Sequence, residues 1–449
     1  MKTVKYLLIT ITFLFSNISY IHAQDTEGTE FWLTFGSVHG GEMYPPFYDM
    51  NIRIVGGNVP TSGTIYFTNL ERTISFDIDP YQIYNYSLDT DEKYAAYNFT
   101  MGITNHSIHI NTLNSVSVYA SIQMDQYFEV TNILPVTALG TEYYAISFHV
   151  FNPNMDAYSV VATQNDTQLY HEGIPISNRV LNAGDVYYRT SYDMTGEHIT
   201  SNKPCAFFTQ NKLTAIPYSG LSDILFQQLA PVNTWGKNFF VPVSLSGIEY
   251  VRIVVSQDNT TISQSGGTIR TDTGGESTLI NLQAGQFVQL EIYLDSAGCY
   301  IQANKPVGVC SFMRSRMISN PEGSTAQVWI PSIEQSVSNV LTAPFIAPPI
   351  GNHYALVCTS TITRENTRVS IGGASPDTLS GGSWYANDTA HISFYNFPLT
   401  NFSSSYIFSN PEGRIWYQGN RCSTRLLLLP CRLCHAYYRC GVLCQRYSL

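Results

Sequence analysis

The sequence predicts an all-β protein made of tandem β-sandwich repeats of immunoglobulin-like size. The chain of 449 residues has only 12% charged residues but 13% aromatic residues, including 31 tyrosines. Low Lys and Glu content together with abundant Tyr, Thr and Val favours strands over helices. Short runs of alternating apolar and polar residues, separated by Gly, Asn, Asp and Pro, have the period of half-buried strands.

Four copies of one β module account for most of the chain. Three of them open on related motifs rich in glycine and aromatic residues: GTEFW at 28–32, GTEYY at 140–144 and WGKNFF at 235–240. Matching positions recur about every 90 to 105 residues, a spacing much longer than that of helical solenoids. We therefore divide this part of the chain into modules at 25–126, 127–213, 214–320 and 321–420.

Two architectures fit such a module. About seven short strands per copy suit a two-sheet sandwich. Alternatively, each copy forms two four-stranded blades of a closed, β-propeller-like ring. Because each copy has its own opening and closing motif, we favour the sandwich.

The first 24 residues have the pattern of a secretory signal peptide. Lys2 and Lys5 precede an apolar run at 7–15, and Ala23 supplies a small residue at the cleavage position. The apolar run is too short to cross a bilayer core of about 30 Å, which argues against a membrane anchor. The pattern predicts a secreted or cell-surface protein without a transmembrane helix.

The composition changes abruptly at residue 421. The segment 421–449 contains five arginines and five cysteines but no Lys, Asp or Glu. Its Cys431–His435 stretch matches the attachment motif of a c-type haem, but a second axial ligand is not evident. A shift of one nucleotide would restore a tyrosine-rich composition, so we interpret 421–449 as a frameshifted tail and expect no cofactor.

Each module is expected to close on a hairpin, and one hairpin would place two cysteines opposite each other. If Asn304 and Lys305 form a two-residue turn, Cys299 lies across from Cys310. Opposed strand positions lie near disulfide distance, and a secreted protein meets an oxidising environment. The alternative is a pair of buried free thiols that pack as small apolar groups.

Charge and motifs exclude several functions. The net charge of −10 gives no basic surface for a nucleic-acid partner. No G-x-S-x-G elbow precedes a helix, and no H-E-x-x-H motif is present, so nucleophilic and zinc-dependent catalysis lack their signatures. We therefore expect a protein that is not an enzyme.

One loop is a candidate binding site. It contains His39, Tyr44, Phe47 and Tyr48 among flexible glycines. Exposed aromatic side chains in such a loop would suit a glycan or a protein ligand. The alternative is a loop that covers the edge of a sandwich and tucks its aromatic side chains inward.

Several of these motifs resemble those of a known family. The segments GTEFWLTF at 28–35, ITSNKPCAFF at 199–208 and PVNTWGKNFFV at 231–241 look like the N-terminal domain of IgG Fc-binding proteins. The resemblance extends over about residues 28–420 and implies a secreted bacterial member that acts in recognition. The family name reflects binding to the Fc part of immunoglobulin G, which makes immunoglobulin Fc a partner by resemblance.

These observations together predict a binding or adhesion protein that recognises a glycoprotein or a glycan at the cell surface. Two other functions remain open. The chain could be a structural spacer or a subunit of an extracellular surface assembly. A carbohydrate-active enzyme is the third, because 33 acidic residues could include a catalytic carboxylate pair that the sequence does not reveal.

Overall fold

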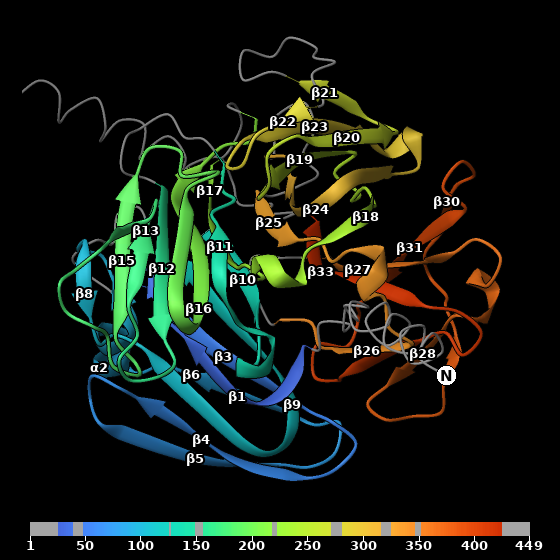
Figure 1. Ribbon diagram of the computed structural model, residues 1–449. Coiled ribbons are helices and arrows are strands. Elements are labelled where there is room, and N and C mark those ends of the chain that lie inside the picture. Colours follow the sequence, from blue (N-terminus) through green and yellow to red (C-terminus); the bar gives the residue numbers. More distant parts are fainter. Residues whose placement is uncertain are drawn as a thin grey trace, which may run out of the picture.

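The computed structural model describes residues 26–38, 48–124, 127–148, 156–217, 222–270, 281–315, 325–345 and 352–423. Strands dominate throughout this part of the chain, and the predicted all-β class is confirmed (Figure 1). The strands pair into three large sheets, two four-stranded sheets and one two-stranded sheet, and this succession of sheets along the sequence fits tandem β-sandwich-like units. None of the described helices is long and apolar enough to cross a membrane.

The first sheet has the order β5-β4-β9-β3-β6, with β1 and β10 also paired to β9. Its strands are β1 (Glu27–Leu33), β3 (Asp49–Gly56), β4 (Thr61–Phe67), β5 (Arg72–Ile78), β6 (Ile83–Ser87), β9 (Ile108–Met124) and β10 (Tyr127–Ile133). A parallel pair, β2 (Phe35–Gly36) and β7 (Tyr97–Asn98), lies beside it. Helix α2 (Thr90–Ala96) begins at a capping box, in which Asp89 and Glu92 each accept a backbone N–H of the other.

The second sheet has the order β14-β13-β16-β12-β15-β8, with β11 and β17 also paired to β16. Its strands are β8 (Gly102–Thr104), β11 (Gly140–Tyr144), β12 (Asp156–Ala162), β13 (Leu169–His171), β14 (Ile174–Pro175), β15 (Val186–Ser191), β16 (His198–Thr214) and β17 (Asp223–Gln228). Strand β8 precedes β9 in sequence and yet pairs with β15, so the second sheet borrows a strand from the first repeat.

The third sheet has the order β21-β23-β19-β24-β20-β22, with β18 and β25 also paired to β24. Its strands are β18 (Gly236–Val241), β19 (Ile248–Val255), β20 (Thr260–Ser265), β21 (Thr268–Arg270), β22 (Asn281–Leu282), β23 (Phe287–Tyr293), β24 (Cys299–Met313) and β25 (Ala326–Trp329). This arrangement repeats that of the second sheet. In the third sheet β18 and β25 pair with the long strand β24, and in the second sheet β11 and β17 pair with the long strand β16.

The last part of the chain forms two four-stranded sheets, β26-β32-β28-β29 and β30-β31-β27-β33. Their strands are β26 (Asn339–Thr342), β27 (Asn352–Ser360), β28 (Arg368–Ile371), β29 (Asp377–Thr378), β30 (Trp384–Asn387), β31 (Ile392–Pro398), β32 (Tyr406–Ser409) and β33 (Ile415–Ser423). Single 3-10 turns connect many elements: η2 (Val136–Ala138), η3 (Val232–Thr234), η4 (Leu294–Ser296), η5 (Ile333–Gln335) and η6 (Arg364–Asn366).

The prediction that each repeat ends in a hairpin is wrong. Residues 300–303 of β24 pair with β20 and residues 307–313 pair with β19, so one continuous strand passes from one group of partners to the other. Strands β9 and β16 do the same, with β4 then β3 and with β13 then β12 as partners. The Asn-Lys-Pro segment marks a corner, because proline withholds one ladder hydrogen bond without reversing the chain.

The continuous strand β24 also contradicts the turn on which the predicted disulfide between Cys299 and Cys310 was based. Cys299 lies opposite Val241, whereas Cys310 lies opposite Arg252 and Trp329, so the two cysteines do not face each other. Both are free thiols and fully buried. Burial raises the pKa of each thiol to about 12.

We expect iodoacetamide to leave Cys299 and Cys310 unmodified in the folded protein. The thiolate is the reactive form, and burial disfavours it as well as blocking access. Peptide mass spectrometry should detect carbamidomethylation of both residues once the chain is unfolded in urea, with no reductant added. If reductant were required for that labelling, the two cysteines would be joined in a disulfide after all.

A close contact links each repeat to the segment that follows it. A Cβ atom placed on Gly28 would lie 2.4 Å from Cβ of Pro135, and one on Gly140 would lie 2.6 Å from Cβ of Pro231. The glycine that opens these motifs is therefore required for the close approach of its backbone to a proline ring of the following segment.

The apolar core extends across the boundaries between repeats. The cluster built around the first sheet includes Val161 and Phe208 of the second sheet, and the next cluster includes Tyr250 and Phe312 of the third. The sheets therefore pack on one another in series, and no single repeat encloses all of its own core. The module boundaries predicted from the sequence stay a prediction, and β10, at the start of the second predicted module, pairs with β9 of the first sheet.

The chain closes on itself between its first and last sheets. Arg53 Nη2 donates to the Phe402 carbonyl oxygen over 2.6 Å, and Ser405 Oγ donates to the Tyr81 carbonyl oxygen over 2.7 Å. Near the middle of the molecule β10 packs along β17 and β17 along β25, close to β33 (Figure 1). The sheets therefore encircle a common centre, as in the ring alternative, although they do not form regular blades.

A buried carboxyl group lies between the second and third sheets. Asp156 accepts hydrogen bonds from the Ser147 hydroxyl and, over 2.8 Å, from the backbone N–H of Met194. Burial raises its pKa well above the ordinary value of 3.8, nearby Asp193 raises it further, and Arg252 only partly opposes this. The carboxyl group therefore holds its proton to higher pH in the folded chain than in the unfolded chain.

Raising the pH from 4 to 8 is expected to destabilise the wild-type chain relative to Asp156→Asn. A folded-state pKa above the unfolded value contributes stability that is complete below the unfolded value and is lost as the pH rises towards the folded one. The amide of the variant does not titrate. Urea denaturation across this range should show a difference between the two proteins that grows with pH, and parallel profiles would contradict the assignment.

Candidate functional site

A cavity of about 790 Å³ lies at the centre around which the sheets are arranged. It is lined by β9 and β10 of the first sheet, β17 of the second, β25 of the third, and β26 and β33 of the last two. Its volume falls within the range of about 300–1,000 Å³ that is usual for pockets that hold small ligands. The site therefore needs most of the described chain to be in place.

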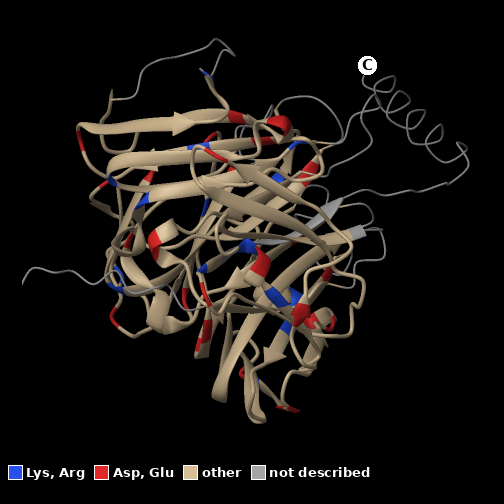
Figure 2. Cartoon of the chain, turned by 90° about the vertical axis from the view of Figure 1, so that its right-hand side faces the viewer, with Lys and Arg blue, Asp and Glu red and all other residues tan. Residues whose placement is uncertain are grey.

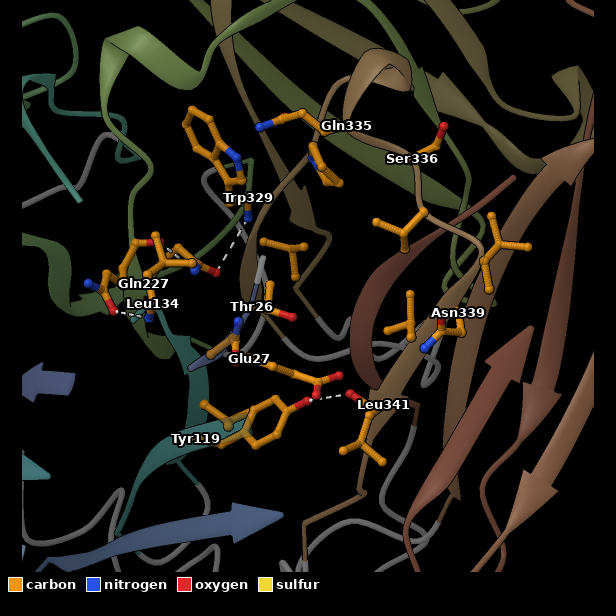
Figure 3. A pocket seen from close by; sticks show the side chains of 18 of the residues that line it. Thr26, Glu27, Tyr119, Leu134, Gln227, Trp329, Gln335, Ser336, Asn339 and Leu341 are labelled. Carbon is orange, nitrogen blue, oxygen red and sulfur yellow. Dashed lines mark hydrogen bonds between the residues drawn. The ribbon is translucent and has the colours of Figure 1, made fainter. Parts of the chain in front are cut away.

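Aromatic side chains form part of the wall. Trp329 at the end of β25 and Tyr119 on β9 lie on different sides of the cavity (Figure 3). The Tyr119 hydroxyl donates towards Thr342 Oγ1 over 3.2 Å, and burial raises the pKa of this phenol to about 12. Tyr119 thus stays neutral and anchors the first sheet to β26. Phe345 packs edge-on against Tyr119, with ring centroids 5.7 Å apart.

Two neighbouring glutamines on β17 organise the polar side of the cavity. Gln228 Oε1 accepts the backbone N–H of Leu134 over 2.8 Å, and the backbone N–H of Gln228 donates to Thr131 Oγ1 over 2.8 Å. Gln227 Nε2 donates to the same Thr131 hydroxyl over 3.1 Å, and its Oε1 accepts the backbone N–H of Trp329 over 3.4 Å. These bonds connect the first, second and third sheets and fix the orientation of both amides.

Three buried amide and indole atoms of the lining have no hydrogen-bond partner within the described part of the chain. They are Asn132 Oδ1, Gln228 Nε2 and Trp329 Nε1. Gln228 is only 2% exposed, and its Oε1 is already committed to Leu134, so its amide orientation is determined. Buried polar atoms are nearly always paired in native proteins. One acceptor and two donors in the wall of this cavity are therefore left unsatisfied within the described part of the chain.

The charge of the lining is predominantly negative. Glu27 and Glu129 line the cavity, and Glu129 is 4% exposed. Arg414 is the cation among the described lining residues, and its Nη1 donates to the Ser336 carbonyl oxygen over 2.8 Å. Over the molecule as a whole, charged residues of both signs are scattered in small groups, with most of the ribbon uncharged (Figure 2).

The loop site predicted from the sequence is only partly visible. His39, Tyr44 and Phe47 lie outside the described residues. Tyr48 is fully buried and stacks on Tyr97, with ring centroids 5.9 Å apart. Tyr48 is thus part of the first core, which corrects its assignment to a binding surface, because a side chain with no exposed area cannot contact a ligand.

Sequence reasoning did not identify the cavity. Its lining comes from short segments that are separated by more than the length of a whole repeat, such as Glu129 on β10 and Gln335 in η5. Each of these segments has the ordinary composition of a strand or a connector. The one available signal was the repetition itself, since the segments occupy related places in successive repeats.

Comparison with known proteins identifies the family. The model of the family described as IgGFc binding protein matches residues 49–191 and 129–412, a range that includes β9, β10, β17, β25 and β26 of the cavity wall. The chain belongs to the IgGFc-binding protein family. The curated human protein named IgGFc-binding protein is 25% identical over 226 residues, which cover 47% of this chain.

The shared region is a small part of that human relative. It corresponds to 4% of the length of the human protein, so the human protein is far longer than the segment that is alike. No solved structure matches the chain. The family membership supports a binding protein and agrees with the resemblance seen in the sequence motifs.

Proposed function

We propose that this IgGFc-binding family member is a secreted binding protein that recognises a glycoprotein or a glycan at a cell surface and does not transform it. The observation that carries the proposal is the central cavity, in which aromatic surfaces and unpaired amide and indole groups converge from three sheets. Such a combination of apolar walls and a few directed polar groups is typical of ligand sites.

Two further features support an extracellular location. The first 24 residues have the composition of a signal peptide. Cys205, Cys299, Cys310 and Cys358 are buried, and burial raises the pKa of each thiol. Thiols of this kind are inert and suit an oxidising compartment even without a disulfide.

The name of the human relative states that it binds the Fc part of immunoglobulin G. For the present chain, Fc is therefore the first protein to test, and it carries glycans whose removal separates protein recognition from glycan recognition. We expect the immobilised chain to bind a glycoprotein and to lose that binding when the glycans are removed enzymatically.

The experiment compares four ligands on one surface: intact Fc, deglycosylated Fc, a mucin-type glycoprotein and its deglycosylated form. Binding that survives deglycosylation would indicate recognition of protein and contradict the glycan part of the proposal. Mass spectrometry of the ligands after incubation should show unchanged glycans, and released sugars would instead indicate an enzyme. Failure to bind any of the four would favour the structural-subunit alternative.

A further inference from the structure

We propose that the central cavity binds the uncharged end of an oligosaccharide, with Trp329 as the principal contact. This inference rests on the proposed function and goes beyond it by naming the site and the chemical character of the ligand. It depends on three properties of the lining, which are its unpaired polar atoms, its aromatic surfaces and its charge.

The unpaired polar atoms favour a ligand with hydroxyl groups. Asn132 Oδ1 needs a donor, whereas Gln228 Nε2 and Trp329 Nε1 need acceptors. A hydroxyl group both donates and accepts, so a ligand with several hydroxyls carries the kind of partner that each of these atoms lacks. Pairing would remove the free-energy penalty of leaving buried polar groups unsatisfied.

The aromatic surfaces suit the apolar faces of sugar rings. Trp329 is partly exposed within a lining that also contains Tyr119 and Phe345. The Tyr119 hydroxyl is already used in its contacts with β26, so this residue offers its ring to a ligand. Aromatic side chains supply large contact areas at small entropic cost, and Trp adds a directed N–H.

A peptide is a less suitable occupant, because the strand edges near the centre are already hydrogen-bonded. Phe128 N–H of β10 donates towards Asp223 Oδ1 over 3.3 Å. The N–H groups of Gln228 on β17 and Trp329 on β25 are likewise bonded by side chains of neighbouring sheets. A peptide that added as a further strand would have to displace these bonds, whereas a sugar does not need a free strand edge.

The charge of the lining selects against acidic sugars. Glu27 and Glu129 would repel a carboxylate or sulfate group, and the Arg414 guanidinium is engaged with the Ser336 carbonyl. The exposed residues of the lining are Ser115 on β9, and Ser338, Asn339 and Arg414 beside β26 and the start of β33, which places the mouth of the cavity at these residues. The rest of a glycan would leave the cavity on this side.

The test uses the chain without residues 1–24 on an array of neutral, sialylated and sulfated oligosaccharides. We expect at least one neutral oligosaccharide to bind, and its sialylated counterpart to bind at least ten-fold more weakly. Trp329→Phe retains an aromatic ring but loses the N–H, so we expect its affinity to fall about ten-fold. Trp329→Ala should abolish detectable binding.

Tyr94→Ala is the matched control, because Tyr94 is 44% exposed on α2 and does not line the cavity. It should bind as the wild type does, and thermal unfolding of all three variants checks that each is folded. Equal affinity for neutral and sialylated forms would overturn the charge argument. Glycoprotein binding that is unchanged in folded Trp329→Ala would overturn the cavity as the site while leaving the proposed function intact. Absence of binding to every oligosaccharide and glycoprotein would overturn both.

Discussion

Replacing Arg252 by alanine is expected to lower the free energy of unfolding by about 3–5 kcal/mol. Arg252 lies on β19, is 2% exposed and projects from the third sheet into the second. Its Nη1 donates to the Ser147 carbonyl oxygen and to Thr195 Oγ1, each over 2.7 Å, and to Asp193 Oδ2 over 3.0 Å. The substitution would leave the Asp193 carboxylate largely buried without its cation.

The position of the guanidinium adds to this effect. It lies 4.5 Å from the ring centre of Phe148, in the segment after β11, and 4.8 Å from that of Phe287 on β23, so it is held between these two aromatic rings. Burial alone would raise the pKa of Asp193, but the charge of Arg252 and bonds from Thr195 hold it below its ordinary value. Alanine would therefore remove a charge pair and two ring contacts at once.

Urea denaturation followed by tryptophan fluorescence measures the change. Arg364→Ala is the control, because the Arg364 side chain pairs with Glu365, whose side chain is 75% exposed. We expect this control to change stability by less than about 1 kcal/mol. An Arg252→Ala protein as stable as the control would show that the second and third sheets do not depend on this residue.

Replacing Phe345 by alanine is expected to cost about 3–5 kcal/mol and to loosen the contact between the first and last sheets. Phe345 is 5% exposed and packs against Tyr119 and Phe128, with ring centroids 5.7 and 6.2 Å away. The Arg53 guanidinium lies 5.8 Å from the centre of its ring. Removing the ring would leave a void that these neighbours can fill only in part.

Hydrogen–deuterium exchange locates this effect. We expect faster exchange in β3 and β26, which flank the contact, and unchanged exchange in β19 and β23 of the third sheet. Ile362→Ala, at a side chain that is 86% exposed, should alter stability by no more than about 0.5 kcal/mol. Equal behaviour of the two variants, or a uniform rise in exchange across the chain, would contradict a local closure by Phe345.

The failed predictions share a physical cause. The segment Ala303–Pro306 has the residues of a turn, but its strand continues because partners are available on both sides of the corner, β20 before it and β19 after it. Tyr48 lies among glycines and aromatics that are typical of an exposed loop, yet it is buried against Tyr97, which is distant in sequence. In both cases contacts between remote segments override local propensity.

The sequence by itself determined the all-β class and the repetition, because alternation of apolar residues and glycine-opened motifs are local properties. It also carried the motifs of the IgGFc-binding family. Only the tertiary structure decided how the repeats share their cores, how the last sheets return to the first, and that a cavity forms at the centre. These features depend on contacts such as those of Gln228 with Leu134 and of Tyr119 with Thr342, whose partners lie about one and two repeats away in sequence.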